Sequence, residues 1–392
     1  MNTKKLIIIF LSVFAGVFIL WIFVFPSFLK LIKEEPKKLN FYELKSKAIG
    51  YDYYVKYYDT AQVNIQKGID SIFNAVEASV FVQNPNSVVS QFNQSDSCVL
   101  VDRVFLDLFF ASDDVYECTN IAFDPTVYTL SRLWGYGEKG STALDTLFPT
   151  VSDAKLRDSL ILEYVDSASA ELEEHMGLSK VRIAGDVLET GDLTEGQKNY
   201  ACKTDSLLQL DFSAIVRGYL VDEIFNFLYY KKKIRNFMVS VGGQVLVAGS
   251  KPDGSRWEVE VKDLFNKVGS STKFHLNHEY SSMAICENFK NAVKIGDEMI
   301  AKTFDPRNYL PVDNGMMTVI VFGQDGVKAE AFATALMVMG PDDARDFVEV
   351  NPTESLEAYF MYTDKKTKQI KTYSSPGLAD IMAADDVKKS ED

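Results

Sequence analysis

Hydrophobic and polar positions along this chain switch between a strand period and a helix period in an irregular order. Residues 51–58 are aromatic and β-prone, residues 237–241 and 317–322 are apolar runs, and residues 257–262 alternate as a half-buried strand does. Residues 355–373 carry a β pattern on both sides of a polar turn and predict a hairpin.

The helical period recurs between these strands. Apolar spacing predicts helices at residues 61–82, 101–111, 153–176, 218–231 and 329–338. Because helices and strands are interspersed without a regular βαβ repeat, we predict an α+β fold rather than a doubly wound sheet.

The first part of the chain carries a long apolar segment. Residues 6–29 include no charged side chain, and about 20 apolar residues are enough to cross the hydrocarbon core of a bilayer. We therefore predict a membrane anchor with one transmembrane helix at 1–33, a linker at 34–48, one folded domain at 49–384 and a charged tail at 385–392. Lysines flank the apolar segment on both sides, so the charge bias does not fix its orientation.

Composition restricts the class of partner. The 392 residues carry 55 acidic and 41 basic side chains, which gives a formal net charge of −14. Nucleic-acid binding rests on Lys and Arg that neutralise phosphates, so an acidic chain argues against it, although a nucleotide in a local pocket stays compatible. With 47% hydrophobic residues the composition is globular, and the length fits one large domain or two smaller ones.

The cysteines leave two interpretations open. No C-x-x-C pair occurs, which argues against a zinc ribbon or a thioredoxin-like site. Cys98 and Cys118 flank one short segment and could form a disulfide in an oxidising compartment. Buried thiols explain the sequence at least as well, because unpaired cysteine is among the most buried residue types.

Two local motifs are weak on their own. Residues 135–140 (GYGEKG) match G-x-G-x-x-G, but no β-branched run precedes them, so a dinucleotide-binding role is disfavoured. His275 and His278 lie in a polar stretch that we expect to be a loop, and two imidazoles alone make an incomplete zinc site.

Glu330 and Thr334 lie four residues apart, on one face of the helix predicted at 329–338. Both offer hard oxygen ligands of the kind that Mg²⁺ prefers. Small and apolar residues surround the pair, so the helix is expected to be buried, and a buried carboxylate needs a partner because an unpaired charge there is costly. The spacing alone does not identify a metal site, since most such pairs are solvated.

Three short segments have the character of turns. Asp124 and Asp305 each precede a proline, which favours an extended conformation for the aspartate. Gly242 and Gly243 end the strand predicted at 237–241 and would let a ligand or phosphate approach the backbone closely. Ordinary turns account for all three segments as well.

Taken together and in order, these segments resemble the FAD:protein FMN transferase (ApbE-like) family over about residues 50–378. The matching blocks are 86–93 (NSVVSQFN), 122–127 (AFDPTV), 133–137 (LWGYG), 210–222 (LDFSAIVRGYLVD), 241–243 (VGG), Trp257, 305–307 (DPR) and 333–336 (ATAL). Any one block is weak, but their common order identifies the chain as a divergent member of this family.

The resemblance implies Mg²⁺-dependent transfer of FMN from FAD to a Thr or Ser hydroxyl of a partner protein, with release of AMP. The partner would be a protein such as a membrane redox complex subunit, and the anchored domain would be periplasmic, at a bacterial inner membrane. By position, the resemblance assigns flavin-nucleotide contacts to Phe81, Ala122, Phe123, Asp124, Asp211 and Arg217, metal ligands to Ala214 (through its carbonyl), Glu330 and Thr334, and catalytic roles to Lys302 and Asp305.

Several pocket positions depart from the family pattern. Arg217 replaces a lysine, Gln244 replaces an acidic residue, Lys302 replaces a histidine and Glu330 replaces an aspartate. The arginine keeps the charge but changes the donor geometry. A lysine can act as a base only where burial or nearby cations lower its pKa.

Bulk is added at the same pocket, because Glu287 and Tyr309 stand where the family has glycine. Two hypotheses follow. The chain is an active FMN transferase with altered residues, or it is a catalytically inactive relative that serves as a binding or structural component of a membrane complex. Turnover on a partner protein would eliminate the second hypothesis.

Overall fold

The computed structural model describes residues 38–134, 172–185, 198–262, 271–277, 281–288, 293–295, 298–350 and 356–382, together with scattered positions between 153 and 164. The predicted anchor at 1–33 and the tail at 385–392 lie outside this part of the chain, and so do residues 135–140 and most of the helix predicted at 153–176. Among the described residues, no helix is both long and apolar enough to cross a bilayer.

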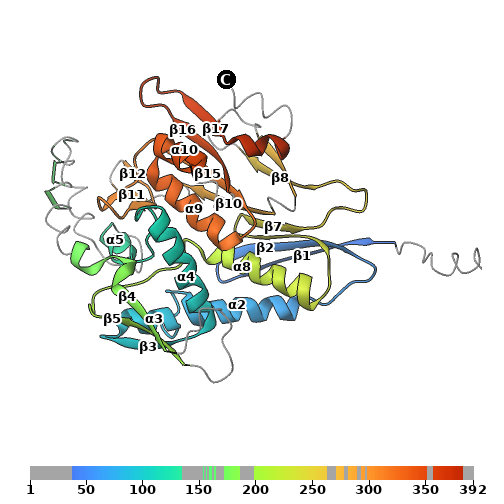
Figure 1. The fold of residues 1–392 in the computed structure, drawn as a ribbon, viewed down its shortest axis with the longest axis horizontal. Helices are drawn as coiled ribbons and strands as arrows, with labels where there is room; N and C mark the ends of the chain where they lie inside the picture. The colour runs from blue at the N-terminus through green and yellow to red at the C-terminus, as the bar shows by residue number, and fades with distance from the viewer. Residues whose placement is uncertain are drawn as a thin grey trace, which may run out of the picture.

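One eight-stranded sheet organises the fold (Figure 1). Neighbouring strands are antiparallel throughout. In spatial order the strands are β1 (Asn40–Ala48), β2 (Tyr51–Asp59), β6 (Asn236–Val241), β7 (Gln244–Ala248), β10 (Ser282–Glu287), β15 (Met316–Gly323), β16 (Glu357–Thr363) and β17 (Ile370–Ser374).

Both faces of this sheet are covered. The larger core lies between one face and the helices α2 (Gln66–Val80), α4 (Arg103–Cys118), α8 (Val216–Asn226), α9 (Gly326–Met339) and α10 (Pro341–Val350). A smaller core on the other face packs under the hairpin of β8 (Trp257–Lys262) and β9 (Ser271–Leu276) and the 3₁₀ turn Pro376–Asp380. Every residue of β7 and β15 is buried, which explains why the central strands are continuous apolar runs rather than alternating ones.

Most of the predicted elements are confirmed. The strands predicted at 51–58, 237–241, 257–262 and 317–322 correspond to β2, β6, β8 and β15, and the predicted hairpin is β16–β17. The helix predicted at 218–231 begins at Val216 as α8 and ends in a π-helical turn, Phe227–Lys231.

Two polar stretches form strands that the hydrophobic pattern did not reveal. We expected residues 34–48 to be a linker, but Asn40–Ala48 is β1, which pairs with β2 along its whole length. As an edge strand, β1 is mostly exposed and shows no apolar alternation. The loop expected around His275 is instead β9, because this segment pairs with β8.

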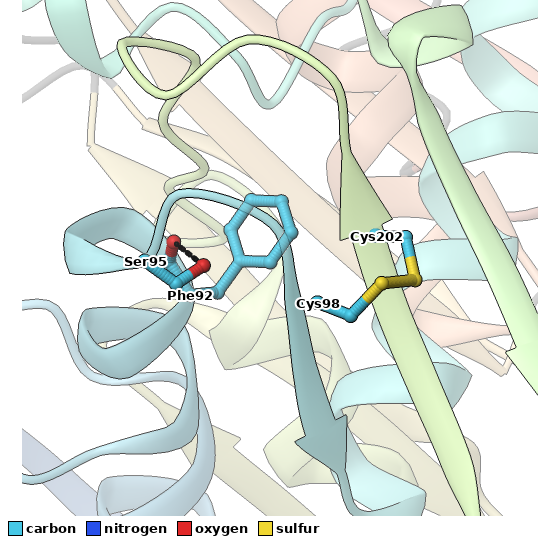
Figure 2. Close-up of a disulfide and its surroundings, with 4 residues drawn as sticks. All are labelled: Phe92, Ser95, Cys98 and Cys202. Atoms are coloured by element: carbon cyan, nitrogen blue, oxygen red, sulfur yellow. Dashed lines mark hydrogen bonds between the residues drawn. A yellow bond between two sulfur atoms is a disulfide. The ribbon is translucent and has the colours of Figure 1, made fainter.

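A small three-stranded sheet lies apart from the main one and consists of β3 (Cys98–Val101), β5 (Asn199–Lys203) and β4 (Val181–Gly185). Cys98 lies opposite Cys202 in the β3–β5 register, and a disulfide joins them (Figure 2). The bond considered between Cys98 and Cys118 does not form, because Cys118 lies at the end of α4.

Helices α8 and α9 cross in backbone contact. A Cβ atom on Gly218 would lie 2.2 Å from the carbonyl oxygen of Gly326, so only glycine fits. From α8, the Asp222 carboxylate accepts the first two N–H groups of α9 at 2.9 Å each. This contact sets Arg217 on α8 beside Glu330 on α9.

Candidate functional site

The first wall of the site is the turn that contains Asp124. This side chain is only 5% exposed, and its Oδ1 accepts hydrogen bonds from the N–H of Thr126 at 2.8 Å and from its hydroxyl at 2.7 Å. Burial raises the pKa of Asp124 from 3.8 to about 6, although the bonds from Thr126 oppose the shift. The Thr126 hydroxyl in turn accepts the N–H of Gly177 at 2.7 Å, which anchors the turn.

Asp211 adjoins this turn. Its backbone N–H donates to the carbonyl of Pro125 at 2.8 Å, and its Oδ1 accepts the N–H of Ser213 at 2.8 Å. The preceding residue, Leu210, is held by both ends of the Asn93 amide, which accepts its N–H at 2.7 Å and donates to its carbonyl at 2.9 Å. Asn93 therefore positions the backbone that presents Asp211.

Asn93 comes from the short helix α3 (Val88–Gln94). Ser87 caps this helix, since its hydroxyl accepts the N–H of Ser90 at 3.2 Å. The two serine hydroxyls are also hydrogen-bonded to each other at 2.9 Å. The matching serines and asparagine in residues 86–93 thus hold the Asp211 loop in place and do not line the site themselves.

The second wall is an ion pair between α8 and α9. Arg217 Nε donates to Glu330 Oε1 at 2.6 Å, and Arg217 Nη1 donates to the carbonyl of Gly242 at 3.0 Å. The other carboxylate oxygen, Oε2, accepts the N–H of Gly218 at 2.6 Å. Burial raises the pKa of Glu330, while the charge of Arg217 and the Gly218 amide act in the opposite direction.

Tyr51 and Cys286 face this ion pair. Burial, reinforced by the charge of Glu330, raises the pKa of Tyr51 to about 12. Burial also raises the pKa of the Cys286 thiol to about 11, against the charge of Arg217. Both groups are therefore uncharged at neutral pH. The two walls are joined through the backbone, because the N–H groups of Ile215 and Val216 donate to the carbonyl of Phe212, so that Asp211 leads directly into α8.

The segment around Lys302 and Asp305 closes the site on a third side. Burial raises the pKa of Asp211, and the hydrogen bonds from Ser213 and the charge of the exposed Lys302 oppose this shift without cancelling it. The Asp305 carboxylate is held by Arg307, whose Nε and Nη2 each donate at 2.8 Å. Asp305 therefore shapes the turn, and its expected catalytic role stays a prediction.

Tyr309 occupies a glycine-like position in the same turn. Its φ angle is +63°, in the left-handed region, which explains why the family pattern has glycine there. Its N–H donates to the carbonyl of Asp305 at 2.9 Å, and its own carbonyl accepts the Trp134 indole N–H at 3.0 Å. These two bonds hold a bulky side chain in an unfavourable backbone conformation.

The remaining residues predicted to contact flavin or metal differ in their burial and contacts. Phe81 is the half-buried C-cap of α2, and its assignment as a stacking residue stays a prediction. Ala122 and Phe123 are 1% and 3% exposed in the main core, so only their backbone could meet a ligand. Ala214 is half-buried just before α8, and the Thr334 hydroxyl donates to the carbonyl of Glu330 at 3.3 Å.

The predicted metal ligands do not fit a resident Mg²⁺. Each Glu330 oxygen already accepts a donor at 2.6 Å, and one of these donors is a cation. A second cation on this carboxylate would meet the charge of Arg217 at close range. Among the described residues, no group of three or more His, Cys, Asp or Glu side chains could hold a metal ion.

Sequence reasoning missed the parts played by Asn93, Tyr51 and Cys286. Asn93 lies in the matching block 86–93 and Tyr51 in the strand predicted at 51–58, but the role of each of the three depends on a partner far away in the chain. Only the order of the blocks hinted that these residues share one site. No local spacing could have shown that the amide of Asn93 holds the backbone 117 residues away.

The comparison with protein families identifies the family of this chain. A model of the ApbE family matches residues 49–360. An FAD:protein FMN transferase of Haemophilus influenzae is 21% identical over 323 residues, which cover 80% of this chain and 85% of that protein. An FAD:protein FMN transferase of Vibrio cholerae is 24% identical over 337 residues, which cover 84% of this chain and 91% of that protein.

Solved structures share the fold. The flavin transferase ApbE from Vibrio cholerae matches with a TM-score of 0.68 and 21% identity, over 88% of this chain and 100% of that one. The apo form of the flavinyl transferase ApbE from Pseudomonas stutzeri matches with a TM-score of 0.69 and 21% identity, over 88% of this chain and 98% of that one. The α+β architecture predicted from the sequence is therefore confirmed.

Proposed function

Because this chain belongs to the ApbE family, we propose that it transfers FMN from FAD to a Thr or Ser hydroxyl of a partner protein. The observation that carries the proposal is the ion pair of Arg217 on α8 and Glu330 on α9, which lies beside Tyr51 and Cys286. Asp211, just before α8, acts on Tyr51 as well, and the charge of Lys302 acts on Asp211. The relatives are FAD:protein FMN transferases, which makes FAD the substrate to test first.

The proposed step is a displacement at phosphorus. The acceptor hydroxyl oxygen forms a bond to the flavin-side phosphorus of FAD, and the bond from that phosphorus to the bridging oxygen breaks. AMP leaves with the bridging oxygen, and the hydroxyl proton passes to a basic group or to solvent. Negative charge grows on the leaving phosphate, so cations at the pyrophosphate lower the barrier.

Two cationic side chains of this chain are suited to that task. Lys302 is exposed next to Asp211, and Arg217 is fixed between Glu330 and Gly242. We assign both to the pyrophosphate. The Mg²⁺ expected at Ala214, Glu330 and Thr334 has no part in this proposal, because the Glu330 carboxylate already accepts from Arg217 and from the Gly218 amide.

The test is an intact-mass measurement. The full-length chain, purified in detergent, is incubated with FAD and a target that carries the family's acceptor sequence, and the target should gain the mass of one FMN. Lys302→Ala should slow the gain about 10- to 100-fold, because one electrostatic contact to the developing charge is lost. Lys262→Ala removes an exposed lysine of β8 and should leave the rate unchanged. A competent target that gains no mass would refute the proposal.

A second candidate is a catalytically inactive subunit of a membrane complex. The closed Arg217–Glu330 pair and the left-handed Tyr309 favour it, since both fill positions that the family pattern leaves to smaller residues. This candidate predicts co-purification with membrane proteins and no FMN gain on any of them. Weak or absent FAD binding would also support it over the enzyme.

We further propose that the folded domain lies in an oxidising compartment, with residues 1–33 as its membrane anchor. The Cys98–Cys202 disulfide supports this location, because such bonds persist outside the cytoplasm. Labelling of intact cells with a membrane-impermeant thiol reagent tests it. Cys98 and Cys202 should react only after reduction, whereas the exposed Cys118 should react without a reductant. Labelling of Cys98 or Cys202 without a reductant, or no labelling of Cys118 in intact cells, would contradict the proposal.

A further inference from the structure

The Arg217 guanidinium occupies the place where a metal ion was expected. Its side chain is 24% exposed, while that of Glu330 is 2% exposed, so the pair has a buried anionic end and a partly open cationic end. Nε and Nη1 are engaged with Glu330 and Gly242. A guanidinium carries five N–H donors in a fork that matches phosphate oxygens, so donors remain for an anion on the open side.

Glu330 also binds the backbone of α8, in addition to the Arg217 side chain. Its Oε2 accepts the N–H of Gly218 in the first turn of α8, where a carboxylate satisfies an N–H that has no partner within the helix. The close contact between Gly218 and Gly326 holds α8 against α9 and keeps this geometry. Opening Glu330 to a metal ion would leave both the amide and the arginine without their partner.

The neighbouring residues carry too little negative charge for an additional divalent cation. Gln244 stands where the family pattern has an acidic residue, and its Oε1 accepts the N–H of Ile285 at 3.1 Å. Thr334 faces the uncharged thiol of Cys286. At this point the charges of Glu330 and Arg217 therefore balance each other.

We propose that the Arg217 guanidinium is the resident cation of this site, and that it binds the pyrophosphate of the substrate without a divalent metal ion between Ala214, Glu330 and Thr334. The inference rests on the proposed function for the identity of the substrate, but not for the binding of a pyrophosphate group. The guanidinium contributes a fixed charge and directional donors.

Binding measurements on the full-length chain in detergent test this inference. Inorganic pyrophosphate and FAD are titrated by calorimetry, with EDTA or with excess Mg²⁺, and Mn²⁺ binding is followed by electron paramagnetic resonance. We expect the Kd values for both anions to change less than about twofold between EDTA and Mg²⁺. Arg217→Lys should weaken pyrophosphate binding about tenfold, because lysine lacks the fork. Arg235→Lys alters an exposed arginine and should have no effect.

The double variant Arg217→Lys with Glu330→Asp provides a gain-of-function test. A shorter carboxylate and a lysine free the space near Thr334, so FAD binding should become Mg²⁺-dependent, by about tenfold in Kd. Thr334→Ala removes a proposed metal ligand without touching the ion pair. Mn²⁺ binding to the wild-type chain that Thr334→Ala abolishes would overturn the inference, and so would a wild-type chain that binds neither pyrophosphate nor FAD. Metal-independent FAD binding without FMN transfer would refute the proposed function alone.

Discussion

Asp124 should make stability depend on pH. Its pKa rises from 3.8 to about 6 because the carboxyl is buried, so the folded chain holds the proton more tightly than the unfolded chain does. The free energy of unfolding should therefore fall as pH rises from 3.8 to about 6, by up to about 3 kcal/mol, and stay at the lower level above that range. Asp124→Asn keeps an acceptor for Thr126 but cannot ionise, so it should remove this loss.

Urea denaturation at several pH values measures the effect. The stability of Asp124→Asn relative to the wild type should increase between pH 3.8 and about 6. Asp342→Asn is the matched control, because that side chain is 93% exposed. If the free energies of unfolding of Asp124→Asn and the wild type changed in parallel with pH, burial would not raise the pKa of the Asp124 carboxyl.

For individual residues, the sequence predicted burial better than it predicted hydrogen-bond and ion-pair partners. The apolar surroundings of Glu330 correctly indicated a buried carboxylate that needs a partner. The partner was expected to be a metal ion, whereas the structure gives Arg217, 113 residues away along the chain. Burial follows from local composition, but the identity of a partner depends on how α8 and α9 cross.

At the scale of elements, that crossing depends on Gly218. A Cβ atom there would lie 2.2 Å from the Gly326 carbonyl oxygen, and backbone cannot rotate away as a side chain can. Gly218→Ala should lower the free energy of unfolding by about 1–3 kcal/mol, despite the better helix propensity of alanine. It should also weaken pyrophosphate binding, because α8 carries Arg217 beside Glu330.

Gly323→Ala is the matched control, since a Cβ atom there meets no atom within 4 Å. Its stability should stay within about 0.5 kcal/mol of the wild type. Thermal and urea unfolding measure the stability of both variants, and pyrophosphate titration of the folded proteins measures their affinity for the anion. Equal stability of Gly218→Ala and Gly323→Ala would mean that the two helices can separate at little cost.

Elements that bury one or both faces were predictable, and an exposed edge strand was not. Strands β2, β8 and β15 carry their burial in the sequence as alternation or as an apolar run. In contrast, β1 is stabilised by the ladder that it forms with β2, and most of its side chains are exposed. A hydrophobic pattern predicts only those elements that bury side chains. An edge strand that is held by backbone hydrogen bonds and exposes most of its side chains therefore cannot be recognised from that pattern.

At the scale of the whole molecule, the pairing of the cysteines could not be predicted from the sequence either. Nearness in sequence suggested Cys118 as the partner of Cys98, but strand pairing selects Cys202, at a separation of 104 residues. A cross-link that closes so long a loop strongly restricts the unfolded chain. Cys98→Ser with Cys202→Ser should therefore lower the free energy of unfolding by about 2–4 kcal/mol.

This last prediction separates the disulfide from the loss of a thiol in general. Cys118→Ser removes an exposed cysteine and should leave the urea midpoint unchanged. Adding a reductant should destabilise the wild type to the level of the double variant and leave the double variant unaffected. The small sheet reaches the site through Lys203, whose ammonium donates to the carbonyl of Leu208 at 2.7 Å, three residues before Asp211. Reduction of the disulfide should therefore weaken FAD binding as well as lower the free energy of unfolding. Unchanged FAD binding after reduction would mean that the disulfide stabilises the small sheet only.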